Sequence, residues 1–117
     1  MTIREMAPLL EARVLCCEED TDVEVINACG SDMMSDVLAF VKDQTALFTG
    51  LINPQVVRTA MMMDMRCIVF VRGKSPTAEI IELAKEHHIV VLATKLRMYE
   101  ACGRLYFELN GKKEETL

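Results

Sequence analysis

The chain has 117 residues, of which 51% are hydrophobic and 26% charged, and its formal net charge is -5. A chain of this length can bury one hydrophobic core without disulfides or metal ions, so we expect one domain over residues 1–117 with its core at about 10–110. No run approaches the ~20 apolar residues of a membrane span, so we expect no membrane association. The acidic balance and an aromatic share of 5% argue against nucleic acid as a partner, because they supply neither a basic surface nor stacking platforms.

The N-terminal segment predicts a short helix over residues 3–11, followed by an alternating run at 13–17. We expect that run to form an edge strand beside the strand predicted at 23–29. Acidic residues interrupt the apolar positions of the first segment, so it does not resemble a signal peptide. The five cysteines form an odd set without a CxxC pair, which favours reduced, mostly buried thiols. Together these features predict a cytoplasmic protein.

Four short apolar runs, at 23–29, 45–49, 67–71 and 89–94, predict the central strands. Their centres lie 21 to 22 residues apart, which is the spacing of a strand, a helix and two short loops. Two of the runs, CIVFV and IVVLA, are apolar without alternation, as is typical of strands covered on both faces. The sequence therefore predicts an α/β fold built from consecutive βα units, with a mostly parallel sheet of four to five strands and helices on both faces.

Helical patterns fill the intervals between these strands. The first repeats apolar residues at helical spacing over 34–41, and Asp32 can cap its free amides. The second begins with Asn53 as N-cap before a proline, and the third begins at Ser75 by the same pattern. A last helix starts at about residue 96.

The end of the last helix and the two histidines carry further expectations. Asn110 and Gly111 are typical of a left-handed cap, so the tail 112–117 is expected to fray. His87 and His88 end the preceding helix, where an imidazolium complements the helix dipole. Because no cysteine or carboxylate lies at ligand spacing from them in the sequence, we predict capping, with no metal site and no cofactor.

Polar residues follow each predicted strand. In an open parallel sheet, ligands bind outside the carboxyl ends of the strands, where loops meet helix N-termini. Glycine lets a ligand approach the backbone, and helix N-termini carry partial positive charge, so an anionic small molecule fits this edge. The candidate ligand-binding residues are Ser31, Asp32, Thr49, Gly50, Asn53, Arg72, Gly73, Lys74 and Thr94.

Some of these residues also have an ordinary structural explanation. For Asp32, Asn53 and Ser75, capping is favoured over ligand contact, because these residue types commonly cap helices and form turns. Arg72 and Lys74 lie beside a glycine at a predicted helix N-terminus, where cations oppose the dipole. For these two residues, ligand binding and ion pairing remain equal alternatives.

No complete catalytic motif is present. Residues 72–75, RGKS, resemble the end of a GxxxxGK[ST] phosphate loop, but its first glycine would fall at Ile68, inside a predicted strand. Both histidines belong at the opposite strand end from the candidate loops, so neither a Ser/His/Asp nor a Cys/His set forms. We therefore predict a protein that is not an enzyme, without catalytic residues.

Over about residues 10–107 the chain resembles the DRTGG-domain family. The resemblance rests on the SDxxSDV stretch at 31–37 and on the ending MYEACGRLY at 98–106. The D-R-T-G-G segment itself is degenerate, since Asp22 remains but Gly30 is the only glycine in the stretch that follows. Such domains are similar to the N-terminal half of HPr kinase/phosphorylase and occur beside CBS domains. The resemblance implies a regulatory binding or assembly module, often a dimer.

Two functions follow as hypotheses. The first is a non-catalytic regulatory module that binds a nucleotide or phosphorylated metabolite at the strand ends. The second is a structural or interaction subunit, acting as a homodimer or as an accessory to a larger complex. Nine methionines favour the second, because exposed methionine suits adaptable interfaces, and Met61, Met62, Met63 and Met65 cover more than one helix face.

Overall fold

The computed structural model describes residues 1–40 and 45–115, together with the side chains of 1–39 and 45–111. Within these residues, five strands form one sheet in the order β1-β5-β4-β3-β2. The parallel strands are β2 (Ala28–Gly30), β3 (Ala46–Thr49), β4 (Cys67–Phe70) and β5 (Val90–Ala93), and β1 (Arg13–Cys16) pairs antiparallel to β5. The predicted α/β class with a mostly parallel sheet is confirmed.

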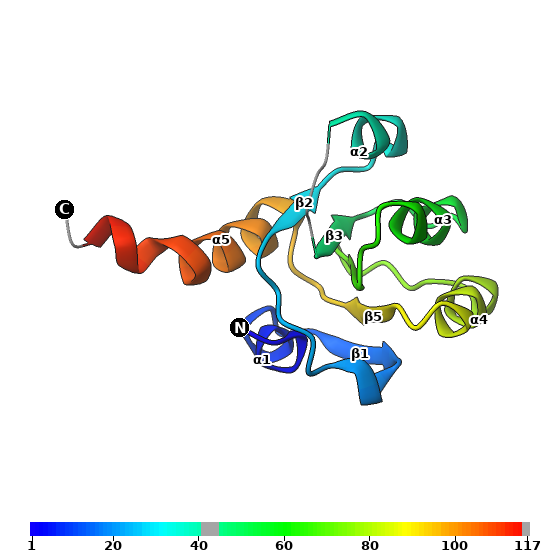
Figure 1. Cartoon of the computed structure of the whole chain (residues 1–117), viewed down its shortest axis with the longest axis horizontal. Helices are drawn as coiled ribbons and strands as arrows, with labels where there is room; N and C mark the ends of the chain where they lie inside the picture. Colours follow the sequence, from blue (N-terminus) through cyan, green and yellow to red (C-terminus); the bar gives the residue numbers. More distant parts are fainter. Residues whose placement is uncertain (41–44, 116–117) are drawn as a thin grey trace.

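Helices cover both faces of this sheet (Figure 1). One face carries α2 (Met34–Phe40), α3 (Gln55–Met62) and α4 (Ala78–Glu86), and the other carries α1 (Ile3–Leu9) and α5 (Met98–Glu115). Every residue of β3, β4 and β5 is buried, because side chains on both sides of these strands pack against helices. The largest side chains of the core include Phe48, Phe70, Ile68 and Leu92.

The edge strand β1 lies at the opposite edge of the sheet from the one we expected. Arg13 pairs with Ala93 of β5, so β1 does not lie beside the predicted strand 23–29. After β1 the chain forms the short 3-10 helix η1 (Glu18–Asp20) and then returns along the N-terminus, where the amide of Ile3 donates to the carbonyl of Val23 at 3.0 Å. This pairing removes the first residues of 23–29 from the sheet, which leaves only Ala28–Gly30 as β2.

The helix starts follow the predicted pattern in part. The N-cap position of α3 is Pro54, one residue after the predicted Asn53, but the Oδ1 of Asn53 still accepts a hydrogen bond from the amide of Gln55 at 2.8 Å. The cap of α4 is Thr77 and not Ser75, since the Thr77 hydroxyl accepts from the amide of Ile80 at 3.3 Å and Thr77 has the extended backbone that an N-cap requires. Val41, the last apolar residue of the helix predicted over 34–41, lies outside the described residues.

The final helix is longer than predicted. α5 passes through Asn110 and Gly111, and neither has a positive φ angle, so the predicted left-handed cap is wrong. Gly111 packs against the ring of Phe107, where a Cβ would lie 2.7 Å from a ring carbon. Helical backbone therefore continues to Glu115, into the tail expected to fray, and residues 116 and 117 lie outside the described part. No helix in the described ranges is both long and apolar enough to cross a membrane.

Candidate functional site

Asp32 joins the ends of three neighbouring strands. Its Oδ1 accepts hydrogen bonds from the amide of Gly50 at 2.7 Å and from the hydroxyl of Thr49 at 3.1 Å, and its Oδ2 lies 3.4 Å from Nη2 of Arg72. Asp32 follows β2, Thr49 ends β3 and Arg72 follows β4, so this Asp32 cluster forms at the C-terminal edge of the sheet. The predicted N-cap role of Asp32 is wrong, because the carboxylate binds the neighbouring strand end instead.

The guanidinium of Arg72 passes directly over Gly50. A Cβ at position 50 would lie 2.1 Å from Nη2 of Arg72, so only glycine permits this approach. Arg72 and Gly73 both have left-handed backbone, with φ of 63° and 70°, and their amides donate to the carbonyls of Leu96 at 2.8 Å and Thr94 at 3.0 Å. The loops after β4 and β5 are therefore tied together, and of the two alternatives for Arg72 the ion pair is formed.

An open hollow of about 490 Å³ lies next along these loops, where β4 and β5 end and β1 begins. Its charged and hydroxyl side chains are Glu11, Arg13, Lys74, Ser75, Thr94 and Lys95. The sequence did not point to Arg13, because it placed β1 at the other edge of the sheet. The antiparallel pairing of β1 with β5 is what brings this cation to the hollow.

The hollow carries an excess of positive charge in a chain whose net charge is -5. Among the described residues that line it, the one carboxylate is Glu11, which is paired with Arg104, whose Nη1 lies 2.8 Å from Glu11 Oε2. Among the described side chains, Arg13, Lys74 and Lys95 form no ion pair. Three cations around one concave surface attract anions more strongly than the net charge suggests.

The other predicted site residues have local structural roles. Thr94 lines the hollow, but its hydroxyl donates to the carbonyl of Leu10 at 2.6 Å and accepts from the amide of Leu96 at 3.1 Å. The hydroxyl of Ser31 accepts from the amide of Met33 at 3.0 Å, and Asn53 accepts from the amide of Gln55 at the start of α3. The structure thus brings together two groups, the Asp32 cluster and the hollow with Gly73 and Lys74, and leaves Ser31 and Asn53 in local turns.

The cysteines are free thiols with raised pKa values. Cys16, Cys17 and Cys67 are buried, and Cys29 and Cys102 are half-buried. Burial raises the pKa of each thiol, and it raises the pKa of Cys17 to about 12. These thiols are therefore protonated and weakly nucleophilic at neutral pH.

Comparison with known proteins identifies both a family match and a shared fold. The DRTGG domain model matches residues 5–106. A solved structure of the CBS and DRTGG domains of the regulatory region of Clostridium perfringens pyrophosphatase, complexed with its activator diadenosine tetraphosphate, has the same fold, with a TM-score of 0.70 and 18% sequence identity over 89% of this chain. The chain spans 45% of that structure's chain. The comparison of the present chain with curated protein sequences found no match.

Proposed function

The chain belongs to the DRTGG domain family, and on that premise we propose that it is a non-catalytic regulatory module that binds a nucleotide or another phosphorylated small molecule at the C-terminal edge of its sheet. The observation that carries this proposal is the hollow with three cations, Arg13, Lys74 and Lys95, that lack ion pairs among the described side chains. Residues 1–117 act as one such module.

The chemistry of the hollow suits phosphate groups. Phosphate oxygens accept short, charge-assisted hydrogen bonds from lysine and arginine, and the hydroxyl of Ser75 adds a neutral donor. A volume of about 490 Å³ falls within the usual range of about 300–1,000 Å³ for small-molecule sites. The activator in the pyrophosphatase structure is a dinucleotide with four phosphates, which supports the choice of nucleotides as the first probes.

The same residues support a binding role over a catalytic one. Glu11 is the carboxylate of the hollow, and it is already engaged in an ion pair with Arg104. The two histidines follow α4 at the other end of β5, away from the hollow. We place the module in the cytoplasm, since five free thiols suit a reducing compartment.

A thermal-shift screen against nucleotides, dinucleotides and phosphorylated metabolites tests the proposal. A ligand at one hundred times its Kd should stabilise the folded chain by about 2.7 kcal/mol and raise its Tm. Lys74→Ala and Lys95→Ala should each reduce the shift, whereas Arg72→Ala should reduce it less because Arg72 already pairs with Asp32. Lys85→Ala is the matched control, since Lys85 is an exposed lysine of α4 outside the hollow. A Tm that no compound moves would contradict the proposal.

A second candidate function is self-association through the outer face of α5. Tyr99, Gly103 and Tyr106 repeat at i, i+4 and i+7, and the two tyrosines are 89% and 62% exposed. Phe107 beside them is 58% exposed, so a second copy of the chain could bury this aromatic face against its own. Light scattering after gel filtration tests this, with Tyr106→Glu expected to shift a dimer to the monomer. A monomer at all micromolar concentrations would contradict it.

A further inference from the structure

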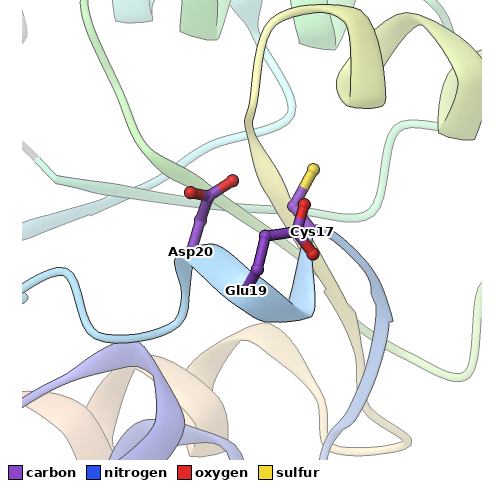
Figure 2. A group of neighbouring side chains, drawn as sticks. All are labelled: Cys17, Glu19 and Asp20. Atoms are coloured by element: carbon purple, nitrogen blue, oxygen red, sulfur yellow. The ribbon is translucent and has the colours of Figure 1, made fainter.

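A group of metal-ligating side chains lies at the opposite end of β5 from the hollow. The sulfur of Cys17 and carboxylate oxygens of Glu19 and Asp20 all lie within 4.8 Å of one another. Figure 2 shows the three side chains on the turn after β1, with the Cys17 sulfur and the Asp20 carboxylate projecting to the same side. Cys17 is the N-cap of η1 and Asp20 is its last residue, so this single tight turn brings the two side chains together.

A histidine from a distant part of the sequence lies beside Asp20, at the edge of this group. His88 precedes β5, and its Nδ1 lies 3.6 Å from Oδ2 of Asp20. That separation is longer than a hydrogen bond. Although the Asp20 side chain as a whole is 26% exposed, its Oδ2 atom is buried and has no hydrogen-bond partner. A buried carboxylate oxygen without a hydrogen-bond partner is costly, so a metal ion bound to this oxygen would stabilise the site.

We propose that Cys17, Glu19, Asp20 and His88 bind one divalent transition-metal ion of the zinc class. Thiolate sulfur, imidazole nitrogen and carboxylate oxygen are the ligand types of Zn²⁺, whereas Mg²⁺ and Ca²⁺ prefer oxygen ligands alone. The ion replaces the thiol proton of Cys17, which passes to solvent, and it supplies the missing partner of Asp20 Oδ2. Glu19 is exposed and the His88 side chain is 74% exposed, so the ion can enter from solvent.

The position of the site indicates that a bound metal ion would stabilise the pairing of β1 with β5. Cys17, Glu19 and Asp20 belong to the turn after β1, and His88 belongs to the loop before β5. A metal ion therefore links the two segments that hold the edge strand β1 against β5. Cys17 and His88 both have left-handed backbone, with φ of 60° and 55°, which is uncommon for residues other than glycine. We expect metal binding to stabilise this edge of the sheet.

Titration of the metal-free, reduced full chain with Co²⁺ and then Zn²⁺ tests the proposal. One equivalent of Co²⁺ should produce a thiolate-to-metal charge-transfer band in the near ultraviolet, and one equivalent of Zn²⁺ should remove it and raise the Tm. Cys17→Ala should abolish the band. Asp20→Asn and His88→Gln should weaken Zn²⁺ affinity by at least about tenfold, since even outer-shell changes have effects of that size. His87→Gln and Cys102→Ala are the matched controls and should bind as the wild type does.

Two results would overturn the proposal. One is a wild-type chain that shows no thiolate band and no stoichiometric binding of either ion. The other is binding that persists in Asp20→Asn and His88→Gln at wild-type affinity. Asp20→Asn keeps the size of the side chain, so the test stands even if Cys17→Ala does not fold. Lys74→Ala should leave metal binding unchanged, which separates this site from the hollow at the other end of β5.

Discussion

Two substitutions of Asp32 should distinguish the contribution of its hydrogen bonds to stability from the contribution of its ion pair. Asp32→Ala removes the acceptor of the Gly50 amide and of the Thr49 hydroxyl, and both of these residues are buried. Two buried donors then lose their partner, which should cost about 2–4 kcal/mol. Asp32→Asn keeps a carbonyl oxygen for both donors and loses only the half-exposed ion pair with Arg72, which is worth about 0–1 kcal/mol.

Urea unfolding followed by circular dichroism measures both changes. The unfolding midpoint should fall strongly in Asp32→Ala and little in Asp32→Asn, with an unchanged denaturant slope. Asp36→Ala is the control, because Asp36 is an exposed acid in the first turn of α2 and its loss should cost at most about 1 kcal/mol. A loss below about 1 kcal/mol in Asp32→Ala, or equal losses in both Asp32 variants, would refute the reasoning.

Three further outcomes are expected. The hydroxyl of Thr59 is buried without a hydrogen-bond partner, so Thr59→Val should raise the free energy of unfolding by about 1 kcal/mol, and a decrease would show that the hydroxyl is bonded. Thr77→Ala should cost about 1 kcal/mol by loss of the α4 cap while Ser75→Ala costs nothing, and the reverse order would restore Ser75 as the cap. Burial raises the pKa of the Cys17 thiol from 9.0 to about 12, so the unfolded chain loses this proton first and stability should fall as the pH rises through this range. Urea unfolding of the metal-free, reduced chain at about pH 8 and about pH 10.5 should show this decrease, and Cys17→Ala should show less of it; equal decreases in both would contradict the assignment.

The central strands could be predicted from sequence because their environment is uniform. β3, β4 and β5 are buried on both faces, so every side chain is apolar or small, and the runs 45–49, 67–71 and 89–94 carry that information locally. The position of β1 could not be predicted in this way. The run 13–17 has the composition of an edge strand, but its choice between β2 and β5 depends on the N-terminus, which pairs with Val23 and removes that segment from the sheet.

The candidate site shows the same division between local and distant information. Asn53 lies two residues before the amide that it binds, so this contact could be predicted from the local sequence. Asp32 stands in an equally good capping position, but its partners lie in the loops after β3 and β4, and only the fold reveals them. The pairing of Asp20 with His88 is likewise a contact between distant segments.

The most direct test of the proposed anion site is isothermal titration of the full chain with ATP and with diadenosine tetraphosphate. Wild type, Lys85→Ala and the double variant Lys74→Ala with Lys95→Ala should be compared at low and at physiological salt. We predict saturable, salt-sensitive binding in the first two chains and an affinity at least about tenfold lower in the double variant, because each lost charge-assisted hydrogen bond is worth about 1.5–3 kcal/mol. Binding of equal affinity in all three chains, or no binding of either nucleotide, would contradict the account.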